Sequence, residues 1–220
     1  MLDTNNGNTR LLVFAKAPEP GLAKTRLMPL LGAEGAARLQ ARLTRRALVT
    51  ALAANVGQVE LWCAPDAGHA FFAALSAELG VALHGQCGGD LGEKILHAAR
   101  MTLAQERYAL IMGTDCPRLT PGHLRQVQHD LQGGRDAVLI PAEDGGYVLL
   151  GLARVSPALF AGVDWGSGRV LQQTRERLAD LDFKTSALDP LPDVDRPEDC
   201  LALGREYPLI WHNLTSEESL

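Results

Sequence analysis

Apolar residues along the chain alternate between short continuous runs and longer amphipathic segments. Runs such as RLLVFAK contain branched and aromatic residues and are too short for helices, so they predict buried strands. Most of these runs are bounded by polar residues, glycine or proline, which end strands. The predicted strands are residues 10–16, 59–64, 81–86, 108–113 and 136–142, with a turn and strand within 143–152 and a strand and loop within 183–191.

Helical segments separate most of these strands. Ala36, Leu39, Leu43, Ala47 and Ala51 recur at spacings of three and four, as on one face of a helix. Strands that alternate with helices predict an α/β fold whose mostly parallel sheet is covered by helices on both faces. The strand within 143–152 follows another strand without a helix between them, which favours a mixed sheet. The predicted helices are residues 33–54, 67–79, 91–105, 120–132, 169–181 and 196–207.

Composition and charge narrow the classes of protein. The chain has 220 residues, 46% of them apolar, and a formal net charge of −5. Because its cations are scattered, a nucleic-acid partner is not expected. Arg38, Arg42 and Arg46 share a helical face that we interpret as solvated. A polar N-terminus and the lack of a long apolar run predict a cytoplasmic protein with no membrane partner, whose oligomeric state the sequence leaves open.

The domain organisation is expected to be simple. No shift in composition forces a boundary, and no repeat is visible along the chain. We expect a disordered polar leader at 1–9, a single domain at 10–208 and a polar tail at 209–220.

The residues that follow each strand are the first place to look for chemistry. In open α/β sheets, ligands bind at the carboxyl ends of the strands, where helix N-termini present free N–H groups. The segment KAPEPGLAKTRL, 16–27, follows the first strand and combines backbone N–H groups with three cations that can hold phosphates. It is not a Walker A loop, because Pro18 and Ala23 occupy the glycine positions. The alternative interpretation is a solvated proline turn.

Asp115, in GTDCPRL, directly follows the predicted strand at 108–113. Its carboxylate suits Mg²⁺ or Mn²⁺, which take few protein carboxylates and complete their shell with water and phosphate oxygens. A turn or cap role is the alternative, although Thr120 and Pro121 already supply a cap and first residue for the next helix. Spacing does not choose the second acid, whose candidates are Asp90, Glu143, Asp144, Asp193 and Asp195.

Two aromatic residues and one short motif complete the candidates. Tyr147 and Trp165 are suited to stacking on a base or sugar, with ordinary buried packing as the alternative. The segment WGSGR resembles a nucleophile elbow, but Trp165 stands where that motif needs glycine. Asp195 has an alternative role as the cap of the helix that begins after Pro197.

Six motifs in order resemble the DUF2064 proteins, which are glycosyltransferase-like members of the GT-A, or nucleotide-diphospho-sugar transferase, superfamily. Some members are labelled arsenosugar biosynthesis glycosyltransferases. The first loop is also similar to that of phospholactate guanylyltransferases, which carry an AK-[ST]-RL element matched here by residues 23–27. The motifs are FAKAPEPGLAKTRL, GDLGEK, GTDCPRL, PAEDGGYVLLGL, DWGSGRVLQQT and DVDRPED.

The resemblance implies a Rossmann-like GT-A fold and a role for each matched residue. It implies catalytic roles for Asp115, Asp144 and Lys24, and metal ligation of Mg²⁺ or Mn²⁺ by Asp115 and Asp195. It also implies that the donor sugar or acceptor lies beside Glu143, Gly145, Gly146, Tyr147 and Trp165. The nucleotide and its diphosphate are expected at Lys16, Pro18, Gly21, Lys24, Thr25, Arg26, Asp90 and Thr114.

The function expected from these matches is that of a metal-dependent transferase. Its partners are a nucleotide sugar donor and a small-molecule acceptor, with Asp144 or Glu143 as a base. Because GTDCP has one acid instead of a D-x-D pair, a nucleotidyltransferase that releases pyrophosphate from an NTP is an alternative. A non-catalytic nucleotide-binding protein with the same fold is a further alternative.

Overall fold

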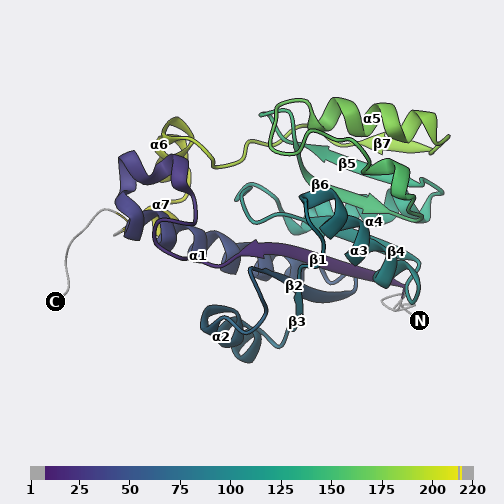
Figure 1. Cartoon of the computed structure of the whole chain (residues 1–220). Coiled ribbons are helices and arrows are strands. Elements are labelled where there is room, and N and C mark those ends of the chain that lie inside the picture. The colour runs from purple at the N-terminus through teal and green to yellow at the C-terminus, as the bar shows by residue number, and fades with distance from the viewer. Residues whose placement is uncertain (1–7, 213, 215–220) are drawn as a thin grey trace.

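Seven strands form a mixed sheet through the centre of the molecule (Figure 1). A computed structural model of the chain describes residues 8–212 and 214. The strand order is β3-β2-β1-β4-β6-β5-β7, and β6 is antiparallel to its neighbours β4 and β5. The expected mixed, mostly parallel sheet is therefore confirmed. The strands are β1 (Thr9–Lys16), β2 (Gln58–Ala64), β3 (Ala82–Gly85), β4 (Tyr108–Met112), β5 (Ala137–Pro141), β6 (Tyr147–Leu152) and β7 (Thr185–Ala187).

Helices cover both faces of this sheet. On one face, side chains of α1, α2 and α4 pack with β-strand residues such as Leu11 and Val13, and on the other α3 and α5 pack against Leu12 and Trp62. The alternation of the β1 side chains between the two cores follows from the pleat of the strand. The helices are α1 (Met28–Ala54), α2 (Ala70–Leu79), α3 (Leu91–Leu103), α4 (Pro121–Gln132), α5 (Val170–Asp180), α6 (Pro197–Glu206) and α7 (Pro208–Trp211), with 3₁₀ turns η1 (Thr25–Leu27) and η2 (Pro157–Leu159).

The helix that follows the first loop begins earlier than its sequence pattern predicts. α1 starts at Met28 and is kinked at Gly32, whose φ of 68° no ordinary helical residue adopts. The predicted start at Ala33 therefore marks the kink instead of the true N-terminus. The kink directs the first turn of α1 toward α6, where Leu27 and Leu31 join a separate small core with Val194 and Leu203.

The C-terminal segment covers the N-terminal half of α1, at the end of the molecule away from α5 (Figure 1). The prediction that the arginine face of α1 is solvated holds for Arg38, which is exposed, and is wrong for Arg42 and Arg46, which are partly covered by other segments. Arg42 donates to the carbonyl of Ile210 at 2.8 Å, and Arg46 donates to Pro117 at 2.8 Å and lies over the Tyr207 ring at 4.5 Å.

The predicted ends of the domain differ from the structure where it describes them. Thr9 is buried in β1, and α7 together with buried Ile210 and Leu214 packs against α1, in place of a polar tail that begins at 209. Residues 1–7, 213 and 215–220 of the expected leader and tail lie outside the described residues.

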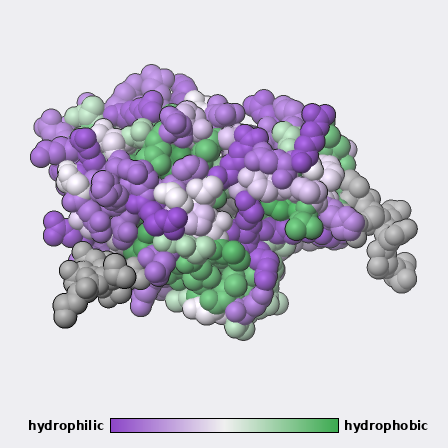
Figure 2. Space-filling view, turned by 180° about the vertical axis from the view of Figure 1, so that it is seen from behind, coloured by the Kyte–Doolittle hydropathy of each residue, from purple (hydrophilic) through white to green (hydrophobic). Residues whose placement is uncertain are grey.

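The surface seen from behind is largely hydrophilic, with an apolar patch low on the molecule, where Figure 1 places α2 (Figure 2). This helix exposes Ala73, Ala74 and Ala77 and buries Phe72 and Leu75. In the part of the chain that the structure describes, no helix combines the length and apolar character needed to cross a bilayer.

Candidate functional site

The loop after β1 is folded by two apolar anchors. Ala23 and Leu27 are buried, and the amides of Leu22 and Ala23 donate to the carbonyl of Glu19 at 3.1 and 3.0 Å. Between the anchors, Lys24 adopts a left-handed backbone with φ of 50°. The anchors leave Lys24 on the inner side of the loop and Arg26 on its solvent side.

Lys24 is the centre of the contacts between the first loop and the rest of the site. Only 4% of its side chain is exposed, and its Nζ lies 2.7 Å from Oδ1 of Asp115. The same Nζ donates to the carbonyl of Val194 at 2.6 Å, and the amide of Val194 donates to the carbonyl of Asp115 at 2.8 Å. One ammonium therefore joins the first loop, the end of β4 and the segment before α6.

A buried polar chain contacts the same oxygen of Asp115 that the Lys24 ammonium approaches. The Thr114 hydroxyl donates to Oδ1 of Asp115 at 3.3 Å, and the buried Gln40 amide donates to Thr114 at 3.2 Å. About half of the Asp115 side chain, 47%, remains exposed. The carboxylate is thus held in place while it still faces solvent.

A cleft of about 560 Å³ opens where β1 to β4 end. Seven of the residues expected at the nucleotide or metal site line it. Three further polar residues that the sequence analysis did not single out, Gln40, Gln86 and Lys94, lie there too. Lys94, in the first turn of α3, adds a cation, and Gln86 donates to the carbonyls of Ala15 and Trp62 at 3.2 and 2.9 Å. The seven expected residues are Lys16, Lys24, Thr25, Arg26, Thr114, Asp115 and Asp195.

The position of Lys94 in the sequence, at the start of a predicted helix that follows a predicted strand, could have identified it as a candidate site residue. It follows Gly92 and Glu93 at the start of a helix that succeeds a strand, which is where α/β sheets bind ligands. The motif GDLGEK drew attention to Asp90 instead. Asp90 accepts from the amide of Glu93 at 2.8 Å as the cap of α3, and is not among the residues that line the cleft. Nor are Pro18 and Gly21, which shape the first loop.

Asp195 forms an ion pair with Arg26 at the border of the cleft. The alternative role as the helix cap falls to Asp199, whose carboxylate accepts from the amides of Asp195 and Arg196 at 3.0 and 2.7 Å. The Asp195 side chain is thereby left to face Arg26 and the cleft.

A second cleft, of about 420 Å³, adjoins the first through Arg26 and Asp195. Its walls include Glu143, Asp144 and the segment 166–168. Gly145 has φ of 93°, and a Cβ there would lie 2.1 Å from the carbonyl oxygen of Gly168. This close approach explains a glycine at that turn, while Gly146 donates to the Asp144 carboxylate at 2.9 Å.

Asp193 lies where the acidic residues converge. With Asp115 and Asp144 it lines a small pit beside Tyr147. Burial, reinforced by the charges of Asp144 and Asp115, raises the pKa of Asp193 to about 6. Within residues 8–212 and 214, no three acidic, histidine or cysteine side chains are close enough to form a complete metal site.

The two aromatic candidates are mainly packing residues. The Trp165 ring lies against Gly92 and stacks on Phe160 at 6.3 Å, and its indole nitrogen is buried without a hydrogen-bond partner among the described residues. Tyr147 is among the residues that line the acidic pit, and burial raises the pKa of its hydroxyl. Trp165 is partly buried and makes packing contacts, and its place at the donor sugar or acceptor stays a prediction.

The chain is similar in fold to solved structures that are named as a transferase and as a synthase, and to one that was solved with manganese. A candidate nucleotide-diphospho-sugar transferase from Desulfovibrio desulfuricans G20 is 29% identical, with a TM-score of 0.80 over 92% of this chain and 96% of its own. A 4-diphosphocytidyl-2C-methyl-D-erythritol synthase from Anaerococcus prevotii DSM 20548 is 9% identical, with a TM-score of 0.62 over 93% and 100%.

A protein from Mycobacterium tuberculosis H37Rv, solved in complex with manganese, is 18% identical with a TM-score of 0.50 over 89% and 97%. These likenesses confirm the expected Rossmann-like fold. The 29% identical structure, which is named as a transferase, supports the transferase class. No curated protein matches the chain. Residues 47–167 match the model of the family described as an uncharacterized protein conserved in bacteria (DUF2064), and the chain belongs to that family.

Proposed function

We propose that the protein is a metal-dependent transferase that takes a glycosyl group from a nucleoside diphospho-sugar and passes it to a small acceptor. The observation that carries this proposal is the composition of the larger cleft. Lys16, Lys24, Arg26 and Lys94 line it together with the carboxylate of Asp115, at the carboxyl ends of the strands. A diphosphate needs cations and backbone amides, and a bound divalent ion needs a carboxylate.

The carboxylates of the site fit a divalent ion. Asp115 already attracts a cation, since the Lys24 ammonium lies 2.7 Å from one of its oxygens, and half of its side chain faces the cleft. Burial, reinforced by the nearby carboxylates of Asp144 and Asp115, raises the pKa of Asp193. Asp115 and Asp195 would hold Mg²⁺ or Mn²⁺, with water and phosphate oxygens completing the shell. Such an ion neutralises the charge of a departing diphosphate.

The protein's own side chains would position the donor and receive a proton. Lys24, Arg26 and Lys94 bind the diphosphate, which leaves as the bond between the sugar C1 and the phosphate oxygen breaks. The acceptor hydroxyl oxygen forms the new bond to C1. Its proton passes to Asp144, which lines both the second cleft and the acidic pit and is held by the Gly146 amide.

Nucleotidyl transfer is the second candidate, and one feature favours it. Lys24, Thr25 and Arg26 of the AKTRL element, 23–27, line the larger cleft, and a single acid follows β4. In that reaction an acceptor phosphate oxygen attacks the α-phosphorus of an NTP, and pyrophosphate leaves.

Product analysis separates the two reactions. The purified protein is incubated with labelled nucleoside diphospho-sugars or NTPs, Mn²⁺ or Mg²⁺, and a panel of hydroxylated and phosphorylated acceptors. Transfer of the labelled sugar, lost in Asp115→Asn and retained in the exposed control Asp180→Asn, supports the proposal. Pyrophosphate release without sugar transfer would replace it with nucleotidyl transfer.

A further inference from the structure

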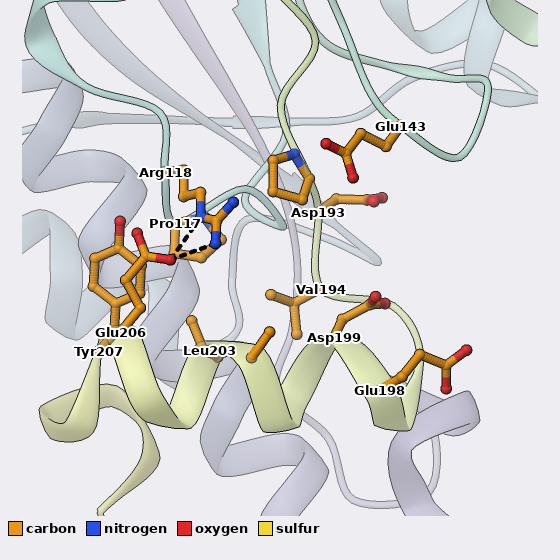
Figure 3. Close-up of a pocket in the computed structure, with 12 residues that line it drawn as sticks. Pro117, Arg118, Glu143, Asp193, Val194, Glu198, Asp199, Leu203, Glu206 and Tyr207 are labelled. Atoms are coloured by element: carbon orange, nitrogen blue, oxygen red, sulfur yellow. Dashed lines mark hydrogen bonds and ion pairs between the residues drawn. The ribbon is translucent and has the colours of Figure 1, made fainter.

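A third cavity lies behind the acidic pit, on the side of α6 that faces β4. Its volume is about 250 Å³, and it shares no lining residue with the larger cleft. It is bordered by Pro117 and Arg118 from the loop after β4, by Glu143, and by α6 up to Tyr207 (Figure 3). The second cleft joins it through Glu143, Asp193 and Glu198 among other shared residues.

The walls of this cavity are fixed by contacts that do not involve a ligand. Arg118 donates to Glu206 at 2.7 Å, which ties the loop after β4 to the last turn of α6. Lys24 and the backbone of Asp115 hold Val194 from both sides. Leu203 is buried in the small core beneath. The cavity is therefore a feature of the folded chain, in keeping with pockets that are largely formed before a ligand binds.

The cavity has two chemically different ends (Figure 3). Tyr207 and the paired Arg118 and Glu206 lie at one end, with Val194 and Leu203 along the floor, while Glu143 and Asp193 lie toward the other end and Glu198 points away from them at the start of α6. Asp199 is satisfied by two backbone amides. Among residues 8–212 and 214, no ion pair involves Glu143, Asp193 or Glu198.

Unpaired carboxylates beside an apolar floor select the charge of the molecule that can bind. An anionic acceptor would place like charges together in a partly desolvated site, whereas a cation would relieve the repulsion. The apolar floor favours a carbon skeleton attached to that cation. The acidic end is also the end that adjoins the second cleft, where Asp144 lies.

We propose that this cavity is the acceptor site and that it takes a hydroxylated amine, with the ammonium beside Glu143 and Asp193 and the apolar skeleton on Val194 and Leu203. The hydroxyl is a few bonds from the ammonium, which places it at the junction with the second cleft. The role of the bound amine as glycosyl acceptor rests on the proposed function. Its binding as a cation can be measured without a nucleotide.

Three phenyl carbinols that differ in one group test the proposal by isothermal titration calorimetry on the full chain. They are 2-amino-1-phenylethanol, its neutral counterpart 1-phenyl-1-propanol and the anion mandelate. We expect the amine to bind at least about tenfold more tightly than the neutral alcohol, a preference that shrinks as salt is raised, and mandelate not to bind. Equal binding of the neutral alcohol, tighter binding of mandelate, or no binding of the amine would overturn the proposal.

Matched variants locate the binding. Glu143→Gln should weaken the amine several-fold and leave the neutral alcohol unchanged, while Glu176→Gln, on the exposed face of α5, should change neither. Unchanged amine binding in Glu143→Gln would contradict the assigned position.

Failure of this inference and failure of the proposed function give different results. If the amine binds as described but no nucleotide sugar does, the proposed function fails and the cation site stands. If sugar is transferred only to neutral or anionic acceptors, the proposed function stands and the acceptor assignment fails.

Discussion

Replacing Lys24 by methionine removes the buried ammonium that joins three segments of the site and keeps a straight apolar chain in its place. Two contacts are lost, the one to the carbonyl of Val194 at 2.6 Å and the ion pair with Asp115 at 2.7 Å. A hydrogen bond from a charged group contributes about 1.5–3 kcal/mol. The pair with Asp115 adds about 0–1 kcal/mol, because half of that carboxylate is in water.

Methionine offsets part of this loss, because it does not carry a charge into a buried position. We therefore expect Lys24→Met to lower the free energy of unfolding by about 2 kcal/mol, which corresponds to a fall in Tm of roughly 4–8 °C for a chain of this size. Lys16→Met is the matched control. Lys16 lines the same cleft, but it is exposed and donates only to the carbonyl of Leu22 in the described residues, so its loss should change stability by less than about 0.5 kcal/mol.

Nucleotide binding gives a second readout for the same two variants. Both lysines face the space assigned to the diphosphate, so calorimetry should record weaker binding of a nucleoside diphospho-sugar in each, by about 10-fold or more for Lys24→Met. Thermal unfolding should separate them, because only Lys24 is also a structural contact. A Lys24→Met protein that unfolds at the wild-type temperature, or a Lys16→Met protein that is equally destabilised, would refute this reasoning.

Three further predictions concern charge, backbone and metal. The pKa of Asp193 is raised to about 6, so the folded state binds more protons than the unfolded state between about pH 4 and 6, and ionised Asp193 destabilises the metal-free protein above pH 6. Chemical denaturation with EDTA should therefore show that Asp193→Asn stabilises the protein more at pH 7.5 than at pH 4.5. An equal effect at both pH values would contradict the raised pKa. Gly145→Ala should lower the free energy of unfolding by well over the roughly 1–2 kcal/mol expected for Gly134→Ala. Both glycines have φ of 93°, but only at Gly145 would a new Cβ meet a backbone oxygen, that of Gly168. Equal melting temperatures of the two variants would argue against that contact. EDTA should abolish the rise in Tm produced by a nucleoside diphospho-sugar and leave the Tm of the ligand-free protein unchanged, and a large fall in the ligand-free Tm would instead indicate a structural ion.

The strands and helices were readable from the sequence because period and length are local properties. The run before Asp115 is buried on both faces and the segment after Gly32 is amphipathic, so each indicates its own secondary structure. The pairing of β6 between β4 and β5 was not readable, because it depends on how distant strands fit together. The sequence indicated only that no helix separates the strand within 143–152 from the strand before it.

The candidate site was predictable where it depends on residues that directly follow strands. Lys16 and Asp115 lie at the expected edge of the sheet. Residues whose role depends on folding of the C-terminal segment were harder to place. Asp193 and Asp195 are two residues apart, yet one is drawn into the acidic pit and the other toward Arg26. The arginine face of α1 was misread in part for the same reason, since sequence periodicity does not reveal which later segment covers a helix.

Calorimetric titration of nucleoside diphospho-sugars in the presence of Mn²⁺ tests the central claim most directly, since the claim is that Asp115 and the cations of the larger cleft hold a metal-bound diphosphate. The account predicts that at least one nucleoside diphospho-sugar binds the wild-type protein and Asp180→Asn equally, and that Asp115→Asn weakens this binding by about tenfold or more. Binding that is the same in Asp115→Asn, or that is unaffected when Mn²⁺ is replaced by EDTA, would contradict it.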